Sequence, residues 1–190
     1  MPARTTHISW CTVLFVDYRS GSRDVLPLLG ESAQETDLGK LGGDVVIPGN
    51  GPEGGRLVAI EMKRIEDLLQ SEGSGKLGDT QLRAMFENYQ EIWLLTMGRY
   101  RAGTGGRLEV FKGTKDYGKK EYWKPYSIGG RQVPYSYLES FLVEIQAMGV
   151  HLKQVDDLRM AAYWLLTADR WWSKEWSEHR AMKKFDRTGE

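Results

Sequence analysis

Apolar and polar residues alternate between residues 57 and 63, and this alternation predicts a β-strand. Successive side chains of a strand point to opposite faces of its sheet, so Glu61 and Lys63 share one face, while Ile60 and Met62 share the other. The pattern therefore predicts an acidic and a basic side chain emerging side by side from one strand.

A second apolar run, residues 45–47, directly follows Asp44. The segment 48–55, which separates this run from the first strand, is dense in glycine, proline and asparagine, the residues that favour turns. Two strands joined by such a segment predict a hairpin with a slightly long loop. The hairpin is expected to bring Asp44 close to Glu61.

Helical and strand patterns continue along the rest of the chain. Within the helix expected over 80–90, apolar residues at helical spacing predict a buried face of Leu82, Met85, Phe86 and Tyr89. The elements together predict an α/β fold with a mixed sheet flanked by helices. Strands are expected near 12–17, 44–47, 57–63, 92–97 and 150–152, and helices after Ser22 and over 65–70, 80–90, 135–148 and from 156 or 157 onward.

The polar residues of the hairpin suit metal-dependent phosphodiester hydrolysis. Carboxylates such as those of Asp44 and Glu61 are ligands for Mg²⁺ or Mn²⁺, and a cation held there lowers the pKa of an attacking water. Lys63 beside them would orient that water and neutralise charge on the phosphate. The alternative is an ordinary amphipathic strand that shows Glu61 and Lys63 to solvent as an ion pair.

The segment Gly43-Asp44 followed by Glu61-Met62-Lys63 and Asp67 resembles the GD…ERKxxxD signature of the XPF-type (ERCC4-like) nucleases. These nucleases belong to the PD-(D/E)xK superfamily. The resemblance covers roughly residues 12 to 97. Further matches are an upstream Asp17-Tyr18-Arg19 after an apolar strand and a downstream stretch that contains Asp67-Leu68-Leu69, Ser71, Lys76-Leu77 and Gln81.

The resemblance implies a restriction-endonuclease-like fold, with a mixed central β-sheet flanked by helices. It implies a Mg²⁺- or Mn²⁺-dependent DNA endonuclease acting on branched, flap or junction DNA in repair or recombination. Asp17 would be an additional acidic residue at the metal and catalytic site, and Asp67 would stabilise the start of the following helix. A general or sequence-specific nuclease or exonuclease of the same fold, and a catalytically idle DNA-binding or assembly subunit, are the alternatives.

Three positions depart from the family pattern. Met62 stands where the family usually has arginine, Ser20 where an acid commonly follows Asp-x-Arg, and Lys76 where arginine is usual. Met62 is expected to face away from the metal, so its change need not abolish the chemistry.

The charge of the chain is balanced overall but unevenly placed. Lys and Arg number 26, as do Asp and Glu. Residues 99–131 hold nine basic and three acidic residues, a local net charge of +6, which leaves −6 for the remainder. Aromatic residues are interleaved with the basic ones, so a DNA-contacting loop or hairpin is one interpretation, and a solvated connection with a strand over 107–112 is the other. The residues expected to contact DNA are Arg19, Arg64, Lys112, Lys115, Lys119, Lys120 and Lys124.

Five large aromatic residues gather near the end of the last predicted helix: Tyr163, Trp164, Trp171, Trp172 and Trp176. They are expected to complete the core as the helix packs back on the domain. A surface for a homodimer or heterodimer is the alternative, because XPF-type domains dimerise through late helices and such aromatics anchor interfaces.

Length and composition favour a single domain over residues 1–190, which the resemblance implies is a nuclease domain. Its expected parts are a core at about 12–97, a basic aromatic-rich insertion at about 99–131 and C-terminal helices at about 135–176. The single Cys11 excludes an internal disulfide, and the chain does not open with a secretory signal pattern. We expect an intracellular setting, either the cytoplasm of a bacterium or phage-infected host or a eukaryotic nucleus. No apolar run reaches membrane-spanning length, so no membrane partner is expected.

Overall fold

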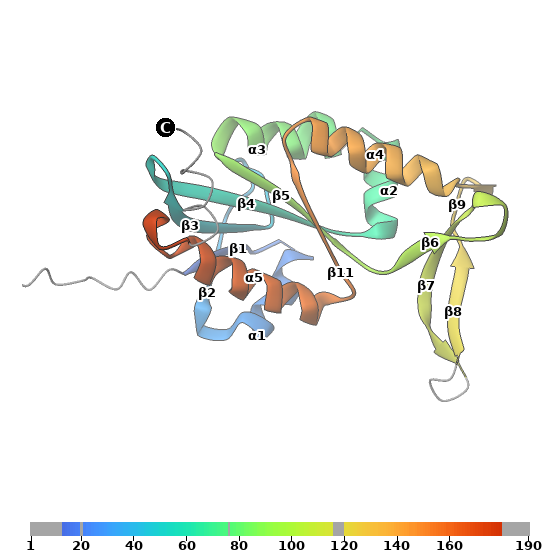
Figure 1. The fold of residues 1–190 in the computed structure, drawn as a ribbon, viewed down its shortest axis with the longest axis horizontal. Coiled ribbons are helices and arrows are strands. Elements are labelled where there is room, and N and C mark those ends of the chain that lie inside the picture. The colour runs from blue at the N-terminus through green and yellow to red at the C-terminus, as the bar shows by residue number, and fades with distance from the viewer. Residues whose placement is uncertain (1–12, 20, 76, 116–119, 180–190) are drawn as a thin grey trace, which may run out of the picture.

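A computed structural model describes residues 13–19, 21–75, 77–115 and 120–179. Its centre is a six-stranded mixed sheet with the strand order β11-β5-β4-β3-β1-β2 (Figure 1). β3 is antiparallel to β1 and β4, whereas the β1–β2, β4–β5 and β5–β11 pairs are parallel. The predicted mixed sheet is therefore confirmed. The strands are β1 (Leu14–Asp17), β2 (Ala33–Thr36), β3 (Val45–Gly51), β4 (Gly54–Arg64), β5 (Glu91–Met97) and β11 (His151–Val155).

Helices cover both faces of this sheet. Figure 1 shows α2, α3 and α4 on one face and α1 and α5 on the other. The α-helices are α1 (Leu26–Leu29), α2 (Ile65–Gly73), α3 (Arg83–Asn88), α4 (Tyr135–Ala147) and α5 (Leu158–Trp172). A π-helix spans Leu77–Leu82, and short 3₁₀ turns span Ser22–Val25, Gly30–Ser32, Thr104–Gly106 and Trp176–Glu178. No helix of the described residues is both long and apolar enough to cross a membrane.

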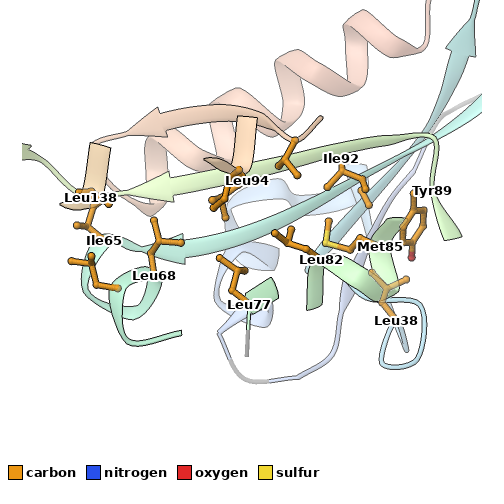
Figure 2. Packing of buried hydrophobic residues seen from close by; sticks show 14 of the residues in the cluster. Leu38, Ile65, Leu68, Leu77, Leu82, Met85, Tyr89, Ile92, Leu94 and Leu138 are labelled. Atoms are coloured by element: carbon orange, nitrogen blue, oxygen red, sulfur yellow. The ribbon is translucent and has the colours of Figure 1, made fainter. Parts of the chain in front are cut away.

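The sheet separates two clusters of buried apolar side chains. Ala59 of β4 belongs to the cluster under α2, α3 and α4, which Figure 2 shows closely packed around Leu68, Met85 and Leu94. Its neighbour Ile60 belongs to the cluster under α5. β4 is therefore apolar on both faces, as expected for a central strand, and this explains its continuous run of buried residues.

The predicted β3–β4 hairpin is confirmed, with Val45 opposite Ile60 and Gly51 opposite Gly54. Two details of the sequence prediction were incomplete. The edge strand β2 was not predicted, because its sequence Ala-Gln-Glu-Thr alternates neither polarity nor burial. The helix expected over 80–90 is instead a π-helix followed by the short α3.

The prediction that Phe86 faces the core was wrong, because 42% of this residue is exposed. Leu82, Met85 and Tyr89 are buried as expected. α3 ends at Asn88 and Tyr89 is already extended, so Tyr89 reaches the core from outside the helix. Regular helical spacing consequently does not decide which residues face inward here.

The basic insertion forms a small sheet of its own, with the order β6-β7-β8. We call this three-stranded antiparallel sheet the ribbon; it consists of β6 (Tyr100–Ala102), β7 (Leu108–Lys115) and β8 (Lys120–Pro125). A two-stranded pair, β9 (Ser127–Ile128) and β10 (Arg131–Gln132), follows it. Figure 1 shows the ribbon standing apart from the six-stranded sheet, on the side where α2 lies.

The aromatic residues at the end of α5 divide between core and surface. Trp172 is buried, and Trp164 and Trp176 pack against the cluster under α5. Tyr163 and Trp171 are 60% and 36% exposed. The predicted packing of α5 on the sheet therefore holds for the first three residues, and a dimer surface formed by the late helices stays a prediction.

Candidate active site

The turn before β3 places Asp44 beside β4. The backbone N–H of Asp44 donates to the Ile60 carbonyl at 2.8 Å, and its carbonyl accepts from the Asp17 N–H at 2.9 Å. Gly42 and Gly43 have φ of 80° and 85°, a backbone conformation that side chains disfavour. A Cβ on Gly42 would also lie 3.0 Å from the Met85 Cγ. The glycines therefore allow the chain to turn sharply and to deliver the Asp44 carboxylate to the strand end.

Both carboxylate oxygens of Asp44 accept hydrogen bonds. Oδ1 accepts from the Ser22 hydroxyl, and Oδ2 accepts from the Met62 backbone N–H at 2.6 Å. Burial raises the pKa of Asp44, and the negative charge of Asp17 raises it further, whereas Lys63 and the two hydrogen bonds lower it. Asp44 is thus held in place, but its charge is incompletely compensated.

Glu61 is buried close to Asp44, with 2% of its side chain exposed. Its Oε1 accepts from the Gln81 Nε2 at 2.6 Å and lies 2.8 Å from the Lys63 Nζ. Burial raises the pKa of Glu61 to about 7, and the nearby Asp44 charge adds to this rise, although Lys63 opposes it. The predicted meeting of Asp44, Glu61 and Lys63 at one point of the sheet is present in the structure.

Asp17 adds a third carboxylate at the end of β1, with 1% of its side chain exposed. It forms an ion pair with Arg19 and accepts from the Leu38 backbone N–H at 3.3 Å. The charge of Arg19 also lowers the pKa of Glu61, so Arg19 lies near the centre. Asp17 and Arg19 are therefore brought to the site as a pair.

A cavity of about 560 Å³ lies between the sheet and α2. Asp44 and Lys63 line it from the sheet, and Asp67 lines it from the first turn of α2. The Met62 side chain also belongs to the apolar cluster under α5, although its backbone N–H holds Asp44. The remaining lining residues are Gly21, Ser22, Gln70, Ser71 and Ser74, all with small or polar side chains. The cavity offers a polar chamber in which a phosphate could meet Asp44 and Lys63.

The donor set fits a hard divalent cation. Asp44 lines the cavity, Glu61 is buried close to Asp44, and both offer oxygen ligands. Burial raises the pKa of both carboxyls, and a cation would neutralise their negative charge. Within the described ranges, no group of three or more His, Cys, Asp or Glu residues is arranged to hold a metal ion. A set of few protein ligands suits Mg²⁺, which retains several waters.

The predicted DNA contacts lie at different places. Arg64 follows Lys63 on β4 and lines a separate cavity of about 460 Å³ with Arg99 and Asp156. Lys112 and Lys124 line a cavity between the ribbon and α2, and Lys115 and Lys120 face each other as cross-strand neighbours near the ribbon tip. Lys119, like Ser20 and Lys76, lies outside the described residues. The basic set is therefore spread over several surfaces.

Two residues that hold the carboxylates received no role from the sequence. Ser22 donates to Asp44, and Gln81 donates to Glu61. Gln81 belongs to the stretch that resembles the family pattern, so its place in that pattern was the available signal. Ser22 carries no such signal, because its contact depends on the 3₁₀ turn after β1.

Two solved structures of XPF from Aeropyrum pernix resemble this architecture. One aligns with a TM-score of 0.57 at 19% identity over 85% of the present chain, and the other, a complex with DNA, with a TM-score of 0.52 at 15% identity over 84%. The fold is that of XPF. The XPF-type resemblance found in the sequence is confirmed at the level of the fold. The present chain spans 62% and 64% of the two XPF chains.

Sequence comparison adds no further relatives. No family model matches the chain, and no curated protein sequence matches it significantly. The likeness to XPF consequently rests on the arrangement of the elements and on the short motif around Asp44 and Glu61.

Proposed function

We propose that the protein is a metal-dependent nuclease that hydrolyses phosphodiester bonds in DNA. The observation that carries this proposal is the meeting of Asp44, Glu61 and Lys63 in an XPF fold, where Asp44 and Lys63 line the cavity and Glu61 is buried against Lys63. Two buried carboxylates beside a lysine are poorly suited to a purely structural role, because burying like charges together costs stability.

The residues divide the chemistry between them. Asp44 and Glu61 would hold Mg²⁺ or Mn²⁺, and Asp17 would add negative charge nearby without being a third ligand. The metal would polarise the phosphoryl oxygens and lower the pKa of a water. Lys63, whose Nζ lies 2.8 Å from Glu61, would orient that water and offset the charge that develops on the phosphate. Gln81 and Ser22 would fix the carboxylates.

DNA with a branch, flap or junction is the proposed substrate, and the XPF-type resemblance supports this choice. One of the similar XPF structures is a complex with DNA. A general or sequence-specific nuclease of the same fold would use the same residues, so substrate preference has to be measured directly.

Cleavage of end-labelled DNA tests the proposal. The native protein and the Lys63→Ala and Asp44→Ala variants are each incubated with Mg²⁺ or Mn²⁺ and one DNA substrate. The substrates are linear duplex, single-strand, 3′-flap, splayed-arm and four-way-junction DNA. We expect cutting by the native protein and a loss of about 100-fold or more in either variant. Lys174→Ala is the matched control, because Lys174 lies after α5 beside Asn50, near the opposite end of the β3–β4 hairpin.

The set of substrates also separates the alternatives. Preferred cutting of the flap, splayed or junction DNA supports the branch-specific function, and equal cutting of linear duplex supports a general nuclease. DNA binding by the native protein without cutting of any substrate would instead identify an idle binding subunit.

A further inference from the structure

The surface of the ribbon that is turned toward α2 contains a second cavity, of about 310 Å³. Lys112 and Lys124 contribute two ammonium groups to it, and Tyr126 and Ser127 contribute two hydroxyl groups. Glu66 of α2 is the one acidic residue among its described lining residues. Donors and positive charge therefore predominate, which suits an anionic ligand.

Regular strand alternation turns Lys112 toward this cavity. Val110 and Lys112 are two residues apart on β7, so their side chains share one face of the ribbon, and both line the cavity. The Lys112 ammonium reaches across to α2, where it forms an ion pair with Glu66.

Two contacts fix the ribbon to the first turn of α2. Besides the Lys112 ion pair, the Tyr126 hydroxyl donates to the Glu66 backbone carbonyl at 3.2 Å. Lys124 is exposed and has no hydrogen bond or ion pair with any described residue. One of the two cations in the cavity is therefore compensated by Glu66, and the other is not.

The opposite face of the ribbon is already neutralised. Arg99 pairs with Glu121, and Arg101 pairs with Glu109. The Arg101 guanidinium also lies 4.3 Å from the centre of the Trp123 ring. Arg99, just before β6, and Arg101 of β6 are thus already paired with acidic residues, so the side facing α2 is the better phosphate-binding surface.

This cavity and the 560 Å³ cavity at Asp44 and Lys63, which we call the cleft, lie on either side of the same turn of α2. Glu66 lines the first and the adjacent Asp67 lines the second. A polymer with regularly spaced phosphates can occupy both places at once, whereas a mononucleotide can occupy one. The neighbouring positions of the two cavities therefore favour a nucleic acid strand that runs from the cleft over α2 to the ribbon.

We propose that Lys112 and Lys124 form a second phosphate-binding subsite for the strand that enters the cleft, and that Glu66 occupies Lys112 until a phosphate replaces it. This inference rests on the proposed function for the identity of the polymer, but not on cleavage. The Glu66 carboxylate thereby weakens binding by competing with phosphate for the same ammonium group.

Binding measured without cleavage tests the subsite. A fluorescein-labelled 3′-flap DNA is titrated with the full chain carrying Asp44→Asn, at several salt concentrations, without added metal. Adding Lys112→Ala or Lys124→Ala is expected to weaken binding and to reduce the slope of log K against log salt by about one. Lys174→Ala, distant from the ribbon, is expected to leave the slope unchanged, and circular dichroism checks that each variant is folded.

Glu66→Gln tests the competition. It is expected to tighten binding several-fold in the Asp44→Asn protein, and this gain should disappear when Lys112→Ala is also present. An unchanged salt slope in both lysine variants, or an equal gain from Glu66→Gln with and without Lys112, would overturn the inference. The cleavage assay judges the nuclease function separately, because loss of cutting with normal salt slopes leaves the subsite standing.

Discussion

Two buried carboxylates at the cleft, those of Asp44 and Glu61, repel each other. Asp44 and Glu61 are buried close enough that the charge of Asp44 raises the pKa of Glu61. Lys63 and the donors Ser22 and Gln81 offset part of the resulting cost. Binding of a divalent cation or of a proton would remove the electrostatic cost that these groups leave uncompensated.

Because of this repulsion, the stabilisation of the protein by Mg²⁺ is expected to depend on pH. The pKa of Glu61 is raised from 4.5 to about 7, so the proton on Glu61 stabilises the fold below about pH 4.5, and this contribution is lost as the pH rises through about 7. Mg²⁺ takes the place of that proton, so its effect on the melting temperature should grow by several degrees between about pH 5.5 and pH 8. Thermal melts with and without Mg²⁺ measure this, and a shift independent of pH would contradict it.

Gln81 is expected to hold the Glu61 carboxylate in place. Gln81→Ala removes the donor 2.6 Å from the Glu61 carboxylate, so metal affinity or cleavage should fall about 10- to 100-fold while the protein stays folded. Titration with Mn²⁺ and the cleavage assay measure the two effects. Gln90→Ala is a control on the same segment of chain, because Gln90 contacts the backbone of Leu57 rather than Glu61.

At the scale of elements, the site depends on where the β3–β4 hairpin begins. The turn at Gly42 and Gly43 passes under Met85 of α3, and Asp44 follows at once. The same hairpin then returns Glu61 and Lys63 to this end of the sheet. One supersecondary unit therefore positions three of the residues assigned to catalysis.

Gly42→Ala is expected to destabilise the protein by about 1–3 kcal/mol, because its backbone has φ of 80° and its new methyl group would crowd Met85 and Ala84. Urea unfolding monitored by circular dichroism measures the loss. Gly55→Ala is the matched control, since a Cβ there meets nothing within 4 Å and is expected to cost little. Equal stability of the two variants would contradict this account of the turn.

At the scale of the whole molecule, the residues proposed for catalysis and those proposed for DNA binding lie on separate structural units. The carboxylates belong to the six-stranded sheet, and Lys112 and Lys124 belong to the ribbon. Residues that act through different units are expected to affect different kinetic constants.

Variants of the two units are therefore expected to change different kinetic constants. The Lys112→Ala/Lys124→Ala variant should raise KM for flap DNA about 10-fold or more with kcat changed little, whereas Lys63→Ala should lower kcat. Steady-state cleavage over a range of DNA concentrations gives both constants. A fall in kcat alone for the double variant would assign these lysines to the chemical step instead.

The sequence predicted the features that depend on neighbouring residues. Turn formers between two apolar runs predicted the hairpin, and alternation predicted that Glu61 and Lys63 share a face. Contacts between distant segments were beyond such patterns. β2 is held by its pairing with β1, and Lys112 pairs with Glu66, which lies 46 residues away in the sequence.

Both ends of the ribbon segment are held by contacts with the β7 region. Arg107, just before β7, bridges Pro134, just before α4, and the Phe111 N–H of β7 donates to the Arg99 carbonyl, just after β5. Between these contacts the ribbon can change in length or sequence without altering the connectivity of the six-stranded sheet. The ribbon is therefore the place where natural variation or engineering can give the proposed hydrolytic centre a new set of nucleic acid targets.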